Sequence, residues 1–323
     1  MHIRVIPDSV YRQRRPRRAQ AYRAAAPLLA LALTGCTLAP TYERPAMPVP
    51  DAWPADAPDK TPAQAQPMPW RDYFPDKQLQ ALIDQALRNN RDLRIAAQRV
   101  EQARATYGIR RADLFPAVSG SAAYGRLRMP GGLLSSSAQV TSFYDVSLLE
   151  TSWELDFWGR VRNLKDAALE DFLASDESRR AATISLIAQV ANGYLALREY
   201  DERIALTRET IATRAESLRI FRRRFQVGAI SRLDLAQTEI LLQQAQTLEA
   251  QLEQSRAAQA HALDLLVGAP AAWQPAAQPL DDASVRGELG AGLPSSLLEN
   301  RPDIVAAEHT LRGANANIGT ARA

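Results

Sequence analysis

The sequence predicts a mainly helical fold that also contains one β-hairpin. Three observations support this prediction. The segment 161–227 contains no proline and a single glycine, Gly193, which is typical of a very long helix. Residues 118–125 alternate between two kinds of side chain, as in a strand with two unlike faces. The composition, with 46% hydrophobic but only 7% aromatic residues among 323, favours an elongated coiled coil over a compact enzyme.

Residues 1–35 are predicted to form a signal peptide. An arginine-rich stretch precedes the apolar run Ala24–Leu33, which is too short to span a membrane because a spanning helix needs about 20 apolar residues. Small residues then lead into Cys36, the only cysteine of the chain. This order resembles a bacterial lipobox, in which the thiol is diacylated, and two acyl chains attach a protein stably to a membrane. The alternative is a buried free cysteine, and in either case no intrachain disulfide can form.

The charge pattern gives little support for nucleic-acid binding. The net charge of +3 owes much to the basic stretch within residues 1–35, so the mature chain is expected to be near neutral or acidic. Its remaining basic residues are interleaved with acidic ones and form no one-sign stripe. No later run of 18 apolar residues occurs, so a mature chain that crosses a membrane would have to do so with strands.

After Cys36 the sequence predicts a proline-rich strap over residues 36–75, because the prolines between Thr37 and Pro69 exclude a helix. A first structural repeat, 76–290, then begins with two helices, Asp76–Asn89 and Arg91–Asp113, and Asp76 is predicted to cap the first of them. The apolar residues at helical spacing are Leu79, Leu82, Ile83, Ala86 and Leu87 in the first helix, and Leu93, Ala96, Ala97, Val100 and Ala103 in the second.

Residues 115–157 are predicted to form a long β-hairpin. Pro116 ends the preceding helix, and a glycine- and serine-rich loop, 128–138, separates the two strand-like runs, the second of which extends from Thr141 to Asp156. Glu154 and Asp156 are expected to lie on one face of this strand. Two interpretations remain open: an edge hairpin packed on the helices, or part of a membrane barrel, whose signal in each strand is weak.

Residues 160–267 are predicted to form a long antiparallel helical hairpin with its tip at 227–234. Gly228 can adopt the positive φ that ends a helix, and Ser231 is a candidate N-cap with Asp234 at the third helical position. The tip is either a simple connector or a docking point. The predicted heptad seam of the second helix contains Leu241, Ala245, Leu248, Leu252, Ala262 and Leu266, with Ser255 and Gln259 at its polar positions.

An internal repeat is visible at a shift of 211 residues. Asp92 aligns with Asp303, Gly108 with Gly319 and Arg111 with Arg322, which makes duplication a better explanation than a chance match of two helices. Residues 291–323 are therefore predicted to begin a second repeat.

Five motifs in order resemble those of the TolC-like outer-membrane factors of tripartite efflux pumps, in the lipoprotein branch called nodulation-T type. These motifs are Cys36-Thr-Leu-Ala-Pro-Thr-Tyr-Glu-Arg-Pro45, Trp70-Arg-Asp-Tyr-Phe74, Trp153-Glu-Leu-Asp-Phe-Trp-Gly-Arg160, Val227-Gly-Ala-Ile-Ser-Arg-Leu-Asp-Leu-Ala236 and Leu298-Glu-Asn-Arg-Pro-Asp303.

The resemblance implies a homotrimer in the outer membrane. Each protomer would contribute strands to a shared transmembrane β-barrel and long helices to a periplasmic α-barrel, loaded by an inner-membrane pump and a periplasmic adaptor. Cys36 would carry the lipid, including a palmitate. The tip residues expected to meet or shape the contact with the adaptor are Val227, Gly228, Ala229, Ser231, Leu233 and Asp234.

No enzyme is expected, and no cofactor beyond the covalent lipid. The histidines His2, His261 and His309 lack the spacing of metal ligands, and Glu154 and Asp156 are more simply polar residues of a strand.

The resemblance also predicts a departure from the family, whose members carry two complete repeats. By the repeat alignment Ala323 corresponds to Ala112, so a second strand pair, a second long hairpin and the family's gate residues are expected to be missing. We therefore expect an incomplete form that does not conduct on its own. The alternative function is a lipid-anchored periplasmic coiled-coil scaffold that docks to an adaptor without conducting.

Overall fold

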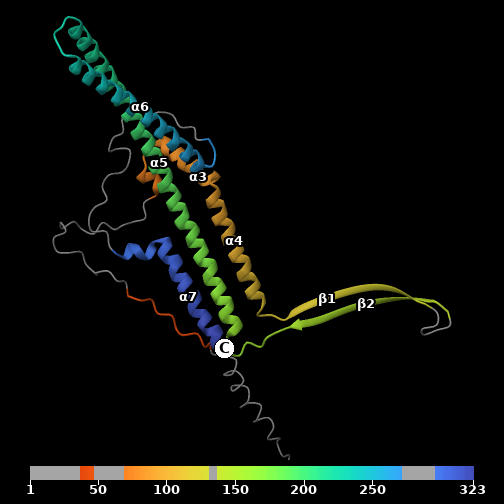
Figure 1. Cartoon of the computed structure of the whole chain (residues 1–323). Helices are drawn as coiled ribbons and strands as arrows, with labels where there is room; N and C mark the ends of the chain where they lie inside the picture. The colour runs from red at the N-terminus through yellow and green to blue at the C-terminus, as the bar shows by residue number, and fades with distance from the viewer. Residues whose placement is uncertain (1–36, 47–68, 131–136, 271–294) are drawn as a thin grey trace, which may run out of the picture. The chain divides into compact units, whose positions relative to one another are not determined.

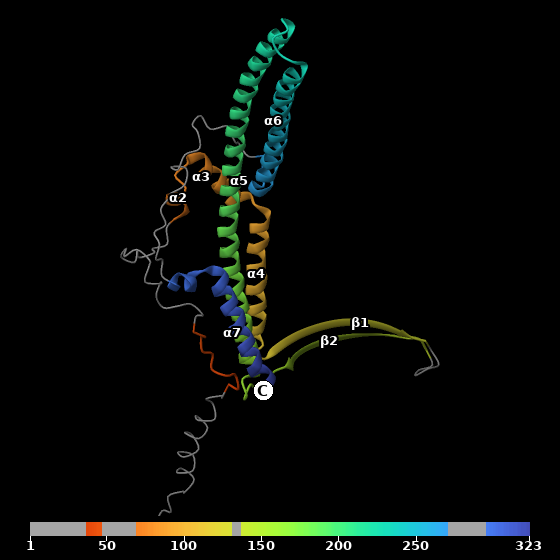
Figure 2. The same ribbon diagram turned by 60° about the vertical axis from the view of Figure 1, so that its left-hand side comes forward.

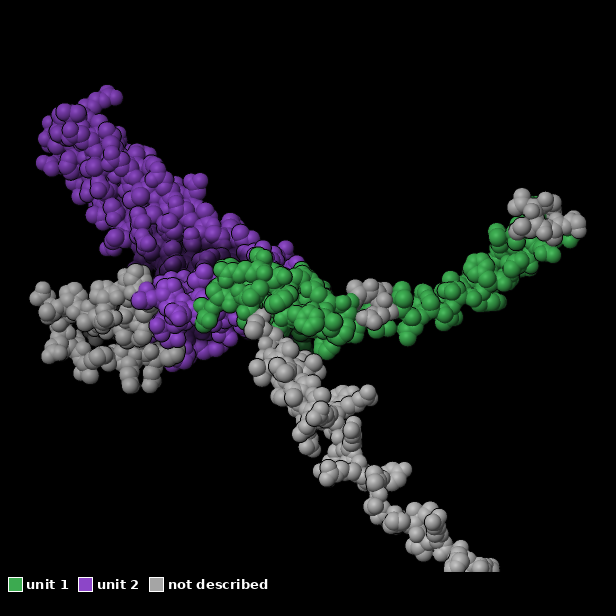
Figure 3. Space-filling model, turned by 90° about the horizontal axis from the view of Figure 1, so that it is seen from below, with its two compact units in different colours: residues 1–41, 109–167, 314–323 green, residues 42–108, 168–313 purple. Residues whose placement is uncertain are grey.

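The computed structural model describes residues 37–46, 69–130, 137–270 and 295–323. The predicted signal peptide and Cys36 lie outside the described residues. The chain divides into two compact units: residues 1–41, 109–167 and 314–323 form one, and residues 42–108 and 168–313 form the other (Figure 3). Within the described part of the chain, no helix is both long and apolar enough to cross a membrane.

The predicted order of elements is confirmed, as Figure 1 shows. The helices are α2 (Trp70–Tyr73), α3 (Lys77–Asn89), α4 (Arg91–Ala112), α5 (Arg160–Gln226), α6 (Arg232–Val267) and α7 (Pro302–Arg322), with a 3-10 helix, η2, at Ser295–Asn300. The strands are β1 (Ala117–Met129) and β2 (Gln139–Ser152). The predicted strap, 36–75, did not include α2, a single turn that fits between Pro69 and Pro75.

A small hydrophobic core in the second unit joins α3 to α5 and α6. The apolar stripe predicted for α3 is buried at Leu79, Leu82, Ile83 and Ala86. The core residues that it meets are Leu186, Val190, Ala191, Tyr194 and Leu197 of α5 and Leu263 and Val267 of α6.

Asp76 caps α3 as predicted, and it has a second role that the sequence did not reveal. Its Oδ1 accepts hydrogen bonds from the backbone N–H groups of Gln78 at 2.8 Å and Leu79 at 3.2 Å. Its Oδ2 accepts one from the Tyr194 hydroxyl of α5 at 2.6 Å. Burial and this bond to Asp76 raise the pKa of Tyr194 to about 12. The cap therefore also fixes α3 on α5.

The start of α4 and the end of α6 are tied together by a buried amide. Asn90 accepts a hydrogen bond from the Leu93 N–H and donates one to the Leu266 carbonyl, both at 2.8 Å. Next to this contact Gly268 ends α6 with φ 75°. A Cβ at Gly268 would lie 2.6 Å from the Asn89 carbonyl oxygen, so this approach requires glycine.

The 67 residues of α5 form one continuous helix, about 100 Å long at about 1.5 Å per residue. In Figures 1 and 2, α6 runs back alongside the C-terminal part of α5. Ion pairs connect the two helices: Arg256 with Asp201 at 2.6 Å, Arg208 with Glu249 and Glu253 at 2.7 and 2.6 Å, and Arg222 with Glu239 at 3.1 Å. The predicted antiparallel hairpin is thus confirmed.

The heptad seam predicted for α6 is correct at some positions and wrong at others. Ala245 and Leu252 are buried as predicted, but Leu241 and Leu248 are 45% and 44% exposed. Leu242 is buried in place of Leu241. Leu241 and Leu242 are adjacent, so either could belong to the buried face of α6. Which of them is buried depends on the position of α5, and the periodicity of α6 alone does not give that position.

The β-hairpin is confirmed as an antiparallel pair with a bulge at Ala117 and Val118. The prediction that β2 reaches Asp156 is wrong, because the strand ends at Ser152. Glu154 forms an ion pair with Arg160, and Asp156 accepts a hydrogen bond from the backbone N–H of Arg162 at 2.9 Å. These two carboxylates therefore secure the start of α5 rather than line one face of a strand.

Candidate functional site

The candidate site is the turn between α5 and α6. Gly228 has φ 76°. The N–H of Gly228 donates to the Phe225 carbonyl, and the N–H of Ala229 donates to the Arg224 carbonyl, both at 2.9 Å. These are the two bonds of a Schellman motif, which satisfies the last carbonyl groups of a helix. The sequence-based expectation that Gly228 ends α5 is thus confirmed.

The start of α6 is held by the predicted capping box. Ser231 Oγ accepts the Asp234 N–H at 3.1 Å, and Asp234 Oδ2 accepts the Ser231 N–H at 3.0 Å and the Ser231 hydroxyl at 2.7 Å. The hydroxyl bond, together with the backbone bond, holds the pKa of Asp234 below its usual value. Both helix ends are therefore closed locally, without help from the rest of the chain.

All six predicted tip residues lie at this turn and are exposed. Val227 is 67% exposed and Leu233 is 66% exposed. A Cβ placed on Gly228 would meet no atom within 4 Å. The turn thus carries two exposed apolar side chains and has open space around its glycine.

A run of arginines near the tip was not among the predicted site residues. Arg222, Arg223 and Arg224 are consecutive and exposed in the last turn of α5. Arg222 forms the ion pair with Glu239 across the hairpin. The three adjacent arginines directly precede the predicted tip in the sequence, so their place beside the turn was predictable, but no motif marked them as site residues.

The β-hairpin has two unlike faces, as predicted. On one face Tyr124 packs against Tyr144, with ring centroids 4.9 Å apart, and Val146 follows with 84% of its surface exposed. On the other face Ser121 and Ser147 share a hydrogen bond at 2.7 Å. Nearly every residue of β1 is exposed, which contradicts an edge hairpin packed on helices.

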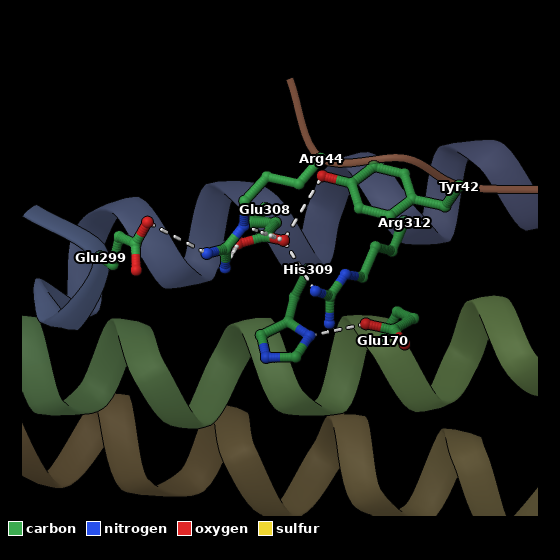
Figure 4. A network of polar contacts seen from close by, with 7 residues as sticks. All are labelled: Tyr42, Arg44, Glu170, Glu299, Glu308, His309 and Arg312. Carbon is green, nitrogen blue, oxygen red and sulfur yellow. Dashed lines mark hydrogen bonds and ion pairs between the residues drawn. The ribbon is translucent and has the colours of Figure 1, made fainter. Parts of the chain in front are cut away.

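A polar network fixes the strap to α7 and α7 to α5 within the second unit (Figure 4). Glu308 of α7 accepts hydrogen bonds from Arg44 and Tyr42 of the strap and forms an ion pair with Arg312. Its neighbour His309 contacts Glu170 of α5, with 2.6 Å between Nδ1 and Oε2. These pairs join residues far apart in sequence, so local patterns did not reveal them.

The strap residue Thr37, next to the predicted lipidation site, is anchored in the first unit. Its hydroxyl donates to Asn163 Oδ1 at 2.9 Å. A Cβ on Gly319 would lie 2.4 Å from Asn163 Nδ2 and 2.8 Å from the backbone nitrogen of Ala39. Gly108, the repeat partner of Gly319, has nothing within 4 Å of such a Cβ. The two copies of the motif are both helical but have different surroundings.

The histidines that the structure describes are His261 and His309. Among the described residues no three histidine, cysteine or acidic side chains gather as metal ligands. His309 is engaged by Glu170, and His261 is exposed.

Comparisons with known proteins identify the family to which the sequence and fold are similar. The family model described as "Outer membrane efflux protein" matches residues 82–269. Outer membrane protein OprJ of Pseudomonas aeruginosa is 40% identical over 308 residues, which cover 95% of this chain and 64% of that protein.

Two crystal structures have the same fold over 89% of this chain. A membrane protein from Pseudomonas aeruginosa has a TM-score of 0.75 and 39% identity, with 65% of that chain covered. The MtrE outer membrane channel of Neisseria gonorrhoeae, in its open state, has a TM-score of 0.74 and 38% identity, with 63% of that chain covered. The chain thus spans just under two thirds of the length of these relatives, and it belongs to the outer membrane efflux protein family.

Proposed function

We propose that the chain is the outer-membrane channel component of a tripartite efflux pump that exports small molecules. The family match supports the proposal, as do the relatives named as outer membrane and efflux pump proteins. The observation that carries it is the combination of a long hairpin with an exposed tip and a two-faced pair of strands in one chain.

In this proposal β1 and β2 enter the membrane. Their apolar face, with Tyr144, Val146 and Leu148 exposed, contacts lipid, and their serine-bearing face lines a water-filled lumen. Each strand has one edge without a partner strand among the described residues. Lipid does not satisfy backbone groups, so these edges call for further strands, which a homotrimer supplies.

The helical hairpin is proposed to meet a periplasmic adaptor through its tip, and the adaptor in turn connects to an inner-membrane pump. The residues assigned to this contact are Val227, Gly228, Ala229, Ser231, Leu233 and Asp234, all of which are exposed. A lipid on Cys36 would add a second attachment to the outer membrane. No enzymatic step and no nucleic acid take part.

A second candidate function is a lipid-anchored periplasmic scaffold that docks to an adaptor without conducting. The hairpin favours this candidate because α5 and α6 close their own tip and form their own ion pairs. In that case the strands would not be embedded in the membrane.

Extraction of membranes at high pH separates the two candidates. The Cys36→Ala chain, which has no lipid, should stay in the membrane if β1 and β2 are embedded, whereas release would favour the scaffold.

A matched pair of variants in the Cys36→Ala chain tests the faces of the strands. Val146→Asp places a charge on the apolar face, at a cost below the roughly 2–4 kcal/mol of arginine or lysine near the middle of the bilayer, and should cause release. Ser147→Asp changes the neighbouring residue on the polar face and should stay. Equal behaviour of the two variants would contradict the assignment of the faces.

A further inference from the structure

Five arginines lie close to the tip of the hairpin in the sequence: Arg219, Arg222, Arg223, Arg224 and Arg232. All five are exposed; four of them lie three to eight residues before Val227, and Arg232 directly follows Ser231. We call this set the basic collar. The exposed apolar residues Val227 and Leu233 lie in the same stretch of sequence.

The charges of the basic collar are only partly neutralised within the chain. Arg219 pairs with Glu216 at 2.7 Å, and Arg222 pairs with Glu239 at 3.1 Å. Arg223 contacts the amide of Gln226, and neither it nor Arg224 has an acidic partner among the described residues.

Asp234 and the ring of Phe221 do not neutralise the remaining positive charge of the basic collar. Asp234 is committed to the capping box with Ser231, and Arg224 lies 5.8 Å from the centre of the Phe221 ring. Arg232 has no ion pair with a described residue. A net positive charge is therefore presented at the turn.

The arrangement of the basic collar suits an end-on contact. Consecutive residues of a helix are about 100° apart around its axis, so Arg222, Arg223 and Arg224 point in three different directions. A helix that lies on a membrane surface instead gathers its basic residues on one face. Unpaired basic residues beside exposed apolar ones favour a partner surface that is both apolar and acidic.

We propose that the tip binds a partner protein through an apolar docking surface flanked by aspartate and glutamate side chains. The inference rests on the proposed docking role of the tip and adds the chemistry of the partner. The guanidinium fork matches a carboxylate with two parallel hydrogen bonds. Burial of Val227 and Leu233 supplies affinity, while the rim charges speed association and reject a basic partner.

The test uses the full chain and synthetic helical-hairpin peptides. The acidic peptide carries a leucine-containing turn flanked by glutamates, and the neutral peptide carries glutamines at the same positions. Binding is measured by biolayer interferometry at about 50 mM and about 300 mM salt, because salt screens exposed charges. The acidic peptide should bind about tenfold more tightly than the neutral one, and the difference should shrink at high salt.

Three variants locate the effect. Arg223→Glu/Arg224→Glu should lose the preference for the acidic peptide, and Arg223→Gln/Arg224→Gln should lose most of it while keeping a neutral helix end. The control Arg94→Glu/Arg99→Glu makes the same change in net charge at exposed positions of α4 and should retain the preference. Circular dichroism checks that each variant keeps its helices.

The remaining outcomes decide between alternatives. Equal binding of the two peptides, or equal loss in the collar and α4 variants, would overturn the inference, as would tighter binding to phosphatidylglycerol vesicles than to the acidic peptide. Val227→Asp reports on docking itself. If it abolishes binding of both peptides while they bind the unmodified chain equally well, the proposed docking role stands and the acidic partner does not.

Discussion

Glycine at a positive φ is required at more than one place in this chain, and the surroundings differ from one place to the next. Gly228 and Gly268 have nearly the same φ, 76° and 75°. Open space surrounds Gly228, whereas Gly268 lies against the backbone of Asn89. The backbone conformation was predictable for Gly228 from the turn chemistry of the sequence. The close approach at Gly268 depends on a residue in another helix and was not.

Alanine at three glycines should separate conformational strain from steric overlap. Gly228→Ala should cost about 1 kcal/mol of unfolding free energy, because a left-handed conformation is strained for alanine. Gly268→Ala should cost clearly more, since its Cβ also meets the Asn89 carbonyl. Gly108→Ala, in a helix with open space, should stabilise by up to about 1 kcal/mol. Urea unfolding measures all three, and equal costs at Gly228 and Gly268 would contradict the role given to Asn89.

At the level of single side chains, local chemistry was predictable and long-range pairing was not. Ser231 and Asp234 form the predicted capping box because both partners lie in one turn of helix. The bond from Tyr194 to Asp76 joins residues 118 positions apart, and no spacing within either helix signals it.

Among the elements, the long hairpin shows what a sequence pattern can and cannot determine. The bounds of α5 and α6 follow from the glycine and serine of the turn and agree with prediction within one residue. The prediction of which face of α6 meets α5 was wrong, because Leu241 and Leu242 are neighbours and each fits a different buried face. The ion pairs across the hairpin are placed nearly symmetrically about the turn, so a register drawn from the tip would have found them.

Two leucines of α6 provide a direct test of this face. Leu252→Ala removes a side chain that is 5% exposed and should cost about 2–5 kcal/mol of unfolding free energy, as buried leucines do. Leu248→Ala removes one that is 44% exposed and should cost less than about 1 kcal/mol in the isolated chain. Chemical unfolding followed by circular dichroism compares them. A larger effect at Leu248 would restore the face predicted from the heptads.

Over the whole molecule, the strap and α7 bring together residues from opposite ends of the chain. Arg44 and Glu308, in the second unit, are 264 positions apart. Thr37 and Asn163, which both belong to the first unit, are 126 positions apart. The sequence predicted an extended strap and a repeated helix, but not that one would bind the other. The internal repeat predicted that α4 and α7 are both helices, but it did not predict that different residues surround them.

The link between the strap and α7 should depend on pH. The Arg44 guanidinium holds the pKa of Glu308 below its usual value of 4.5. A lowered pKa means that the bond contributes its full stability above that usual value and loses it as the pH falls through the lowered pKa. Backbone hydrogens of residues 42–44 should therefore exchange more slowly at neutral pH than below about pH 4, once intrinsic rates are corrected for.

Glu308→Gln serves as the control for this prediction, because glutamine keeps the size of the side chain and removes its charge. Protection in this variant should be low at neutral pH already and should change little on acidification. Hydrogen exchange followed by mass spectrometry, corrected for the intrinsic rate at each pH, measures both chains. Protection of the variant equal to that of the unmodified chain would show that the charge does not hold the strap.

The turn at Gly228 also governs the order in which the hairpin folds. Contacts between α5 and α6 join residues 17 positions apart at Arg222 and Glu239, 41 at Arg208 and Glu249, and 66 at Gly193 and Gln259. Since closing a longer loop costs more entropy, we expect the contacts nearest the turn to form first and the two helices to zip together from there. Substitutions at the exposed turn should then change the folding rate as well as the proposed docking, which stopped-flow refolding of the tip variants would measure.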